Sequence, residues 1–200
     1  GSLKVIFPRM ELAMVMVKDI LEEGDRRKKD SIEALKKELS SVRTGRASPT
    51  LIEGIMVDYY GVPTPLNQLA SVTVPEARLL VVQPWDKQSL PSVEKAILKH
   101  GLGLNPVSDG SVLRLAIPQL TEERRKDLVR VVRKKVEGGR VEVRNIRRDI
   151  LEQLRAMEKN KEISQDESKR GQEQLQKLTD YHIIQMDALS EEKEKEVMEV

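Results

Sequence analysis

The sequence predicts an α+β protein in which long helices flank a short α/β segment that is rich in proline. Apolar residues recur at helical spacing from Thr121 to Lys159, which is typical of one long amphipathic helix. Eight of the nine prolines fall between residues 46 and 120, and this density excludes long helices there. Ser164-Gln-Asp-Glu167 is a capping-box pattern and predicts the start of another long helix.

The central helix has the clearest signals at its start and along its length. Thr121 is a predicted N-cap, and Glu122 and Glu123 suit the positive end of the helix dipole. The apolar stripe comprises Leu128, Val132, Val136, Val143, Ile146, Ile150, Leu154 and Met157. At about 1.5 Å per residue, the helix would be roughly 55–60 Å long.

The two other helices are expected on either side of it. The last runs from the capping box to about Met198. The first is expected from about Val17 to Thr44, with Thr44-Gly45 as its stop. Its stripe comprises Leu21, Ile32, Leu35, Leu39 and Val42, and Lys28 interrupts it.

The N-terminal residues are expected to lie outside the fold. Gly1-Ser2 is typical of a cloning scar, and residues 3–9 are typical of vector or upstream sequence. Residues 1–15 are therefore predicted to be a tag, or disordered or extended. The native start is then Met10, Met14 or Met16.

Between the helices, residues 46–120 form the predicted α/β domain. Short runs rich in Val, Ile, Leu and Tyr predict strands at 55–60, 70–74, 79–82 and 112–117. A helix is expected from about Leu90 to His100, capped by Ser89 and ended by Gly101.

Charge is distributed unevenly although the net charge is only +2. Residues 121–160 carry 13 Lys and Arg against 8 Asp and Glu, whereas residues 161–200 carry 6 against 11. Packed antiparallel, these two helices would attract each other and leave a basic surface on the central one.

The basic surface is predicted from helical projection. Arg133, Arg140, Arg144 and Arg147 fall within an arc of roughly 60° beside the apolar stripe, Lys126, Arg148 and Arg155 extend it, and among the acids Glu137 and Glu122 intrude. A charged helix face is often only solvated. An arginine-rich face mostly cleared of acids favours phosphate binding instead.

Nothing in the sequence indicates an enzyme, a cofactor or a metal site. The chain has no cysteine, and its two histidines, His100 and His182, are interpreted as structural. Gly101-Leu-Gly103 begins like a dinucleotide loop, but it leaves a helix and has Pro106 in place of the last glycine. The absence of cysteine fits a reducing compartment, and no apolar run approaches the roughly 18 residues of a membrane span.

The few aromatic residues are assigned mainly to packing. Tyr59 and Tyr60, as neighbours in a strand, are expected to point to opposite faces, so at least one belongs to the core and the other could stack on a base. Trp85 is interpreted as a packing anchor of the insert.

Several longer strings occur in a characteristic order. They are Arg43-Thr-Gly-Arg-Ala-Ser-Pro49, Asp58-Tyr-Tyr-Gly-Val-Pro-Thr-Pro65, Gln68-Leu-Ala-Ser-Val-Thr-Val74, Val93-Glu-Lys-Ala-Ile97, Leu102-Gly-Leu-Asn-Pro106, Leu120-Thr-Glu-Glu-Arg-Arg-Lys126, Val143-Arg-Asn-Ile-Arg-Arg-Asp149 and Gln176-Lys-Leu-Thr-Asp180. With these strings, the chain from about Val17 to Val200 resembles the ribosome recycling factor family.

The resemblance implies a fold and a function. It implies an L-shaped, tRNA-like monomer in the cytoplasm, with an elongated three-helix bundle of residues 16–45 plus 121–200 and an inserted domain of residues 46–120. Gly45, Arg46, Pro118, Gln119 and Leu120 would form the hinge. The family binds the large subunit of post-termination ribosomes, and elongation factor G with GTP then drives the subunits apart.

For the binding site, the family pattern assigns the critical contacts with large-subunit rRNA to Arg144 and Arg147. These are two of the residues that the helical projection selects. The alternative for Arg147 is an ion pair with Glu173 or Asp180 that only holds the bundle together. Two other function classes also stay open, a general RNA-binding or RNA-remodelling protein and a purely structural helical spacer.

Three features depart from the family pattern or weaken a helix. Gly138-Gly139 lies inside the central helix and predicts a kink or a close helix approach. Gly171 weakens the last helix in the same way. Tyr181-His182 replaces a usual lysine and apolar or aromatic residue, which affects packing nearby.

Overall fold

A computed structural model of the chain describes residues 3–100 and 103–199, so the predictions made for Gly1-Ser2 and for Gly101-Leu102 lie outside the described residues. The chain divides into two compact units. One comprises the described residues up to Leu39 together with Val131–Lys193. The other comprises Ser40–Arg130 and the described residues from Glu194 onward.

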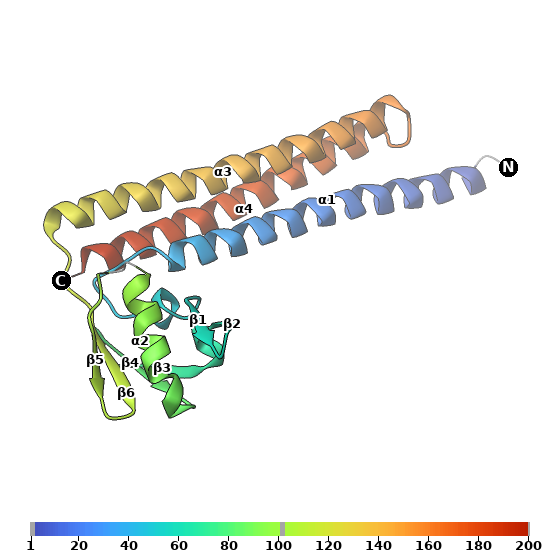
Figure 1. The fold of residues 1–200 in the computed structure, drawn as a ribbon. Coiled ribbons are helices and arrows are strands. Elements are labelled where there is room, and N and C mark those ends of the chain that lie inside the picture. The colour runs from blue at the N-terminus through green and yellow to red at the C-terminus, as the bar shows by residue number, and fades with distance from the viewer. Residues whose placement is uncertain (1–2, 101–102, 200) are drawn as a thin grey trace. The chain divides into compact units, whose positions relative to one another are not determined.

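The first unit is a three-helix bundle built from α1 (Leu3–Ser40), α3 (Glu122–Lys159) and α4 (Gln165–Met198), of which α3 and α4 continue into the second unit (Figure 1). Side chains from all three helices form one core cluster that includes Val17, Leu21, Ile150, Leu154 and Leu175. Each fully buried Leu or Ile contributes roughly 1.5–3 kcal/mol to folding. All eight predicted stripe residues of α3 are buried, which confirms the periodicity argument.

Local capping chemistry sets the starts of α3 and α4 as the sequence predicts. The Thr121 hydroxyl oxygen accepts a hydrogen bond from the Arg124 amide at 3.1 Å. In the capping box, the Glu167 amide donates to Ser164 Oγ and the Ser164 amide donates to Glu167 Oε1, each at 3.1 Å. These bonds satisfy backbone donors that have no partner within a helix.

The first helix differs from its prediction at both ends. It begins at Leu3, so the interpretation of the N-terminal residues as disordered or extended is wrong for the helical stretch from Leu3. Ala13 and Val17 are buried in the bundle core. This packing stabilises the N-terminal part of α1 as a helix, although its apolar periodicity is weak. The helix ends at Ser40 instead of Thr44, and the Ser40 carbonyl accepts a hydrogen bond from Thr50 Oγ1 at 3.3 Å.

Close approach explains two of the glycines that stand out in the sequence. A Cβ on Gly139 would lie 3.2 Å from Leu35 Cδ2 and 3.3 Å from Met186 Cε. A Cβ on Gly171 would lie 3.1 Å from Val17 Cγ1. Helix α3 continues without a break through Gly138-Gly139, so close helix approach, and not an interruption, accounts for Gly139.

The second unit contains an antiparallel four-stranded sheet, a two-stranded hairpin and α2 (Leu90–Lys99). The sheet has the order β3-β4-β6-β5, formed by β3 (Ala70–Glu76), β4 (Leu79–Pro84), β6 (Val112–Ala116) and β5 (Pro106–Asp109). The hairpin pairs β1 (Met56–Tyr59) with β2 (Val62–Pro65). The core of this second unit includes the fully buried residues Val57, Leu80, Val93 and Leu113. The sequence therefore predicted the fold class correctly.

Two strands of this unit are absent from the prediction because both contain proline. Strand β5 begins at Pro106 and occupies the edge of its sheet, where a missing N–H donor leaves no ladder bond unmade. Strand β2 contains Pro63 and Pro65 in a two-stranded sheet. Proline argues against a central strand, but it is tolerated in an edge strand.

Polar and aromatic details of this unit also differ from the predictions. Ser89 lies at the start of α2 but does not cap it, since its hydroxyl donates to the Asp86 carbonyl at 2.6 Å. Trp85 is 67% exposed, so it is not a packing anchor. Tyr60 lies in the hairpin turn with φ 51°, not in the strand, and both tyrosine hydroxyls donate to Asp86 Oδ2. Tyr59 packs against the core, whereas Tyr60 is exposed.

Among residues 3–100 and 103–199, none of the helices combines the length and the apolar character that a membrane-spanning segment requires.

Candidate nucleic-acid interface

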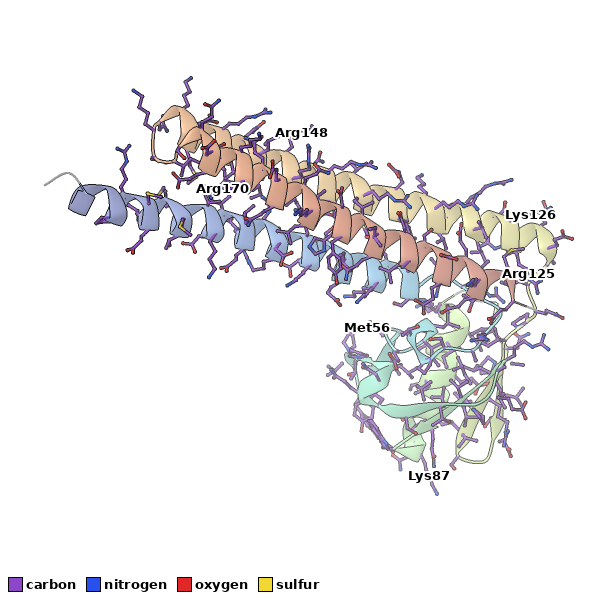
Figure 2. The ribbon with its side chains drawn as sticks, turned by 180° about the vertical axis from the view of Figure 1, so that it is seen from behind. Met56, Lys87, Arg125, Lys126, Arg148 and Arg170 are labelled. Carbon is purple, nitrogen blue, oxygen red and sulfur yellow. The ribbon has the colours of Figure 1, made fainter. Side chains whose placement is uncertain are left out.

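The predicted arginines all lie on the part of α3 that belongs to the three-helix bundle. Arg133, Arg144 and Arg148 are exposed, while Arg140 and Arg147 are partly buried against other side chains. Figure 2 marks Arg148 on α3 and Arg170 on α4. The arginines therefore share a helix but differ in what surrounds each guanidinium.

Arg140 is engaged by acids of its own helix and of α4. It donates from Nε to Asp187 Oδ1 at 2.9 Å and also through Nη2 to the same oxygen, and Nη1 donates to Glu137 Oε2 at 3.1 Å. Burial by itself would lower the pKa of Arg140, but the bonds to Asp187 and Glu137 outweigh it and raise the pKa. The charge of Arg140 is thus directed toward α4.

Among the described residues, Arg144 has one partner, Glu137 of its own helix, and this contact is longer than those of Arg140. Its Nη1 lies 3.3 Å from Glu137 Oε1, and the arginine and glutamate side chains are 53% and 54% exposed. Exposed pairs of this kind contribute little, and salt screens them. Glu137, which the sequence shows intruding on the basic arc, is therefore shared between Arg140 and Arg144.

Arg147 is bound by a neutral side chain instead of an acid. Its Nε donates to Gln176 Oε1 on α4 at 2.9 Å, and Gln176 Nε2 donates to Asp180 Oδ1 at 2.8 Å. Neither Glu173 nor Asp180 forms an ion pair with Arg147 among the described residues. The structural alternative, a direct ion pair between Arg147 and an acid of α4, is therefore not found among the described residues.

Arg148 completes the surface. Within the described residues its guanidinium has no hydrogen-bond or ion-pair partner. The acid beside it, Asp149, pairs with Arg27 on α1 at 3.1 Å. The acid nearest to Arg147 and Arg148 in the sequence, Asp149, is therefore paired with α1. The cationic surface of Arg144, Arg147 and Arg148 keeps most of its charge.

Beneath this surface lies a polar cluster that the sequence reasoning missed. Lys28 is fully buried, and its Nζ donates to Thr179 Oγ1 at 2.9 Å. Burial lowers the pKa of Lys28 to about 8, against the opposing charge of Asp25 and with a further contribution from the charge of Arg147. The signal was present, because Lys28 interrupts the stripe of α1. Its partner Thr179 is buried on α4.

His182 belongs to the same polar interior. It is 1% exposed, and its Nε2 lies 2.7 Å from Asp25 Oδ1. Burial would raise the pKa of Asp25, but its bonds to His182 and Lys29 outweigh this and lower it. His182 thus packs structurally, as expected, and the unusual Tyr181-His182 pair is accommodated by Asp25 of α1.

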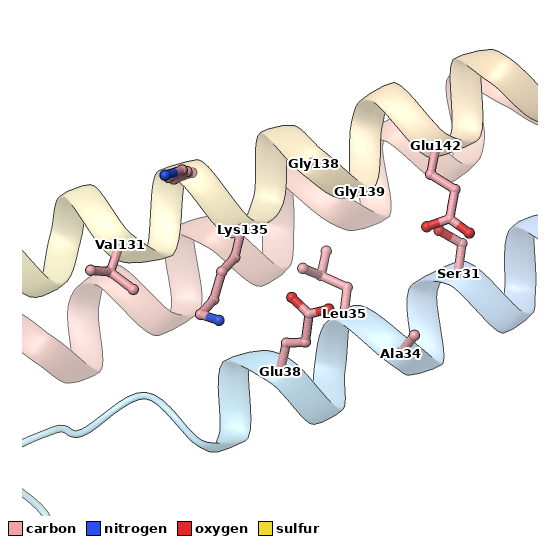
Figure 3. Close-up of a pocket in the computed structure, with 10 residues that line it drawn as sticks. Ser31, Ala34, Leu35, Glu38, Val131, Lys135, Gly138, Gly139 and Glu142 are labelled. Carbon is pink, nitrogen blue, oxygen red and sulfur yellow. The ribbon is translucent and has the colours of Figure 1, made fainter.

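A groove between α1 and α3 lies further along the bundle (Figure 3). It has a volume of about 620 Å³ and is lined by Ser31, Ala34, Leu35, Glu38, Val131, Lys134, Lys135, Gly138, Gly139 and Glu142. In the close-up, Glu142 points toward Ser31 and Lys135 toward Glu38. The lining contains two acids, Glu38 and Glu142, and two bases, Lys134 and Lys135, so the groove does not extend the cationic surface.

The predicted hinge residues lie in the second unit and are tied to it. Arg46 forms an ion pair with Glu199, and the Ala47 amide donates to the Ala77 carbonyl at 2.7 Å. Gly45 does not adopt a positive φ. On the returning segment, which includes Pro118 and Gln119, Leu120 is buried.

These features define a class of protein, an α+β chain with a basic three-helix bundle and a small antiparallel domain inserted between its first two long helices. A family profile described as Ribosome recycling factor matches residues 35–198. The chain belongs to the ribosome recycling factor family.

Relatives and solved structures agree with this assignment. The chain is 60% identical to the ribosome-recycling factor of Syntrophomonas wolfei and 55% identical to that of Heliobacterium modesticaldum. Each match spans 185 residues, which is 92% of this chain and 100% of the relative. A solution structure of a ribosome recycling factor matches with a TM-score of 0.74 and 46% identity, over 92% of this chain and 98% of that one.

A second solved structure places a relative in a complex. It is described as models for the Thermus thermophilus factor and the Escherichia coli elongation factor G bound to the E. coli post-termination complex. The match has a TM-score of 0.65 and 48% identity, and it covers 92% of this chain and 99% of that one.

Proposed function

We propose that this protein binds the large subunit of post-termination ribosomes through the cationic surface of Arg144, Arg147 and Arg148. With elongation factor G and GTP, it then splits the subunits for recycling. It acts as a monomer in the cytoplasm, and it works by binding rRNA rather than by a chemical step. Family membership supports the role, and the solved complex of a relative with elongation factor G supports the partner.

The observation that carries the binding site is the way Arg147 is held. A neutral amide binds its Nε, so the guanidinium is fixed while its charge is not cancelled. Arg144 and Arg148 flank it with little or no neutralisation. Guanidinium groups bind phosphates and base edges through two parallel hydrogen bonds, so this arrangement suits rRNA.

The other candidate arginines receive different roles. Arg140 is bound to Asp187 and Glu137, so we assign it to holding α3 and α4 together. Arg133, exposed on α3, extends the basic surface toward the start of the helix.

For the domain organisation, we infer that residues 16–45 plus 121–200 fold as one discontinuous domain around the insert of 46–120. Gly45, Arg46, Pro118, Gln119 and Leu120 would serve as the hinge. Supporting this, the apolar core of the insert draws on residues between Ile52 and Ile117.

The test is a light-scattering assay of subunit splitting. Post-termination ribosomes, a matching elongation factor G and GTP are mixed with the protein, and a fall in scattering is expected only when all are present. Binding to isolated large subunits is compared with binding to an unrelated RNA of similar length. Equal affinity for both, without splitting, would show a general RNA-binding protein and would contradict the proposal.

A further inference from the structure

A chain of two hydrogen bonds links Arg147 of α3 to two side chains of α4. Arg147 Nε donates to Gln176 Oε1 at 2.9 Å, and Gln176 Nε2 donates to Asp180 Oδ1 at 2.8 Å. Gln176 and Asp180 are one helical turn apart on α4, so both face the same side of that helix. All three side chains belong to the three-helix bundle.

The direction of this chain follows from the chemistry of the three groups. An arginine side chain has only donors, a carboxylate has only acceptors, and an amide has both. Because Asp180 accepts from the amide nitrogen, the amide oxygen of Gln176 is turned toward Arg147. Arg147 and Asp180 therefore require the same orientation of the Gln176 amide, and Asp180 holds its nitrogen end.

The bond to Gln176 occupies only one edge of the guanidinium. Arg147 Nη1 and Nη2 have no partner among the described residues, so the four N–H groups that suit a phosphate or a guanine edge stay available. At Arg140, by contrast, the carboxylate of Asp187 binds Nε and Nη2, and Glu137 binds Nη1. An amide partner orients a guanidinium without neutralising it, which a carboxylate cannot do.

Lys28 adds a second influence from inside the bundle. Its Nζ is bound to Thr179, three residues after Gln176 on α4, and it is close enough to Arg147 for the two charges to repel. A buried positive charge on the inner side disfavours any inward rotamer of Arg147. The guanidinium is thus held by Gln176 and repelled from the interior.

We propose that Gln176, oriented by Asp180, is a positioning residue that fixes the Arg147 guanidinium so that its two terminal nitrogens meet rRNA. This inference rests on the proposed function and deepens it, because it names side chains of α4 that act through Arg147 without touching RNA themselves. Preorganisation of this kind strengthens binding by removing the cost of ordering a flexible side chain.

The first variant to test is Gln176→Met, which keeps the length of the side chain and removes both hydrogen bonds. We expect it to weaken binding to isolated large subunits about three- to tenfold, the usual range for losing one such bond. Because Gln176 is exposed, the melting temperature of the Gln176→Met variant should stay close to that of the unmodified protein. The matched control is Gln174→Met, an exposed position on α4 that makes no hydrogen bond within the described residues, and it should bind normally.

A double-mutant cycle with Arg147→Ala separates positioning from a general structural effect. If Gln176 acts through Arg147, Gln176→Met should cause no further loss of binding once Arg147 is alanine. An equal loss in both backgrounds, or a loss that accompanies a lower melting temperature, would overturn the positioning role.

The same cycle distinguishes failure of this inference from failure of the proposed function. If Arg147→Ala itself binds normally, the proposed rRNA site is wrong whatever Gln176→Met does. If Arg147→Ala binds weakly but Gln176→Met binds like the control, the site stands and the positioning role alone is wrong.

Asp180→Asn should weaken binding less than Gln176→Met, since its side-chain oxygen still accepts from Gln176. A loss as large as that of Arg147→Ala would contradict the proposed order of the chain.

Discussion

Two regions of the bundle, seven residues apart on α3, use the same amino acid in opposite ways. Around Arg140 the surface is neutralised by Asp187 and Glu137, and the interior beside it is apolar, with Leu35 and Met186 against Gly139. Around Arg147 the surface partner is the neutral Gln176, and the interior contains the buried Lys28.

The difference shows that a row of arginines is not a uniform surface. The Arg140 region is balanced in charge, and its guanidinium serves to join α3 to α4. In the Arg147 region the buried Lys28, whose charge Asp25 only partly offsets, lies close to Arg147. This is unfavourable for folding but favourable for binding a polyanion. Such a local cost, retained in a folded protein, is typical of a functional site.

The largest expected effect concerns the interior of the Arg147 region. The pKa of Lys28 is lowered to about 8 from 10.5, so burial disfavours its charged form in the folded state. Lys28→Met should raise the free energy of unfolding at pH 7 by up to about 3 kcal/mol, since one pKa unit corresponds to about 1.4 kcal/mol.

The same variant has a defined pH dependence. Between about pH 8 and 10.5 the unfolded chain binds more protons at this lysine than the folded one, so the unmodified protein gains stability as pH rises through that window. The advantage of Lys28→Met should therefore shrink toward pH 10.5. Urea denaturation at pH 7 and pH 10 measures it, with Lys177→Met, an exposed lysine of α4, as control. A variant that is less stable at both pH values would show that Lys28 contributes favourably.

The next effect concerns the surface of the Arg147 region. Arg147→Ala should weaken binding to large subunits by about 1–3 kcal/mol and leave the melting temperature nearly unchanged. Arg147→Lys should restore only part of the affinity, because an ammonium cannot reproduce a bidentate contact. Binding measured at several salt concentrations should show a shallower salt dependence for the alanine variant. A variant that melts several degrees lower but binds normally would argue for a structural role.

The matching change in the Arg140 region should have the reverse pattern. Arg140→Ala removes the bonds to Asp187 and Glu137, so it should lower the free energy of unfolding by about 1 kcal/mol. Its affinity for large subunits should change little. Thermal melting and the same binding assay measure the two effects, and a binding loss equal to that of Arg147→Ala would remove the contrast between the regions.

The smallest effect compares the adjacent glycines of the Arg140 region. Nothing lies within 4 Å of a Cβ on Gly138, so Gly138→Ala should raise the free energy of unfolding by about 1 kcal/mol through helix propensity alone. Gly139→Ala should gain less or lose stability, because its Cβ would press on Leu35 and Met186. Urea titration of both variants is sufficient. Equal increases in the free energy of unfolding would mean that Leu35 of α1 and Met186 of α4 can shift to make room for a Cβ at Gly139.

Much of the helical architecture could be predicted because its signals are local. The stripe of α3, the cap at Thr121 and the capping box at Ser164 depend on residues three or four positions apart, and the structure confirms all three. The predictions were wrong where a local rule is compatible with more than one structure. Proline was compatible with the edge strands β2 and β5, and the stop expected at Thr44-Gly45 came earlier, at Ser40.

By itself, the sequence determined the family, the fold class and the arc of arginines on α3. Only the tertiary structure decided which arginine is neutralised, because the deciding partners lie far along the chain. Asp187 is 47 residues from Arg140, and Gln176 is 29 residues from Arg147. Helical periodicity places a side chain on a face of its own helix, but it does not determine the rotation and offset of the helix packed against it. Those follow from how glycines and core side chains of all three helices interlock, and they place an acid opposite one arginine and an amide opposite the other.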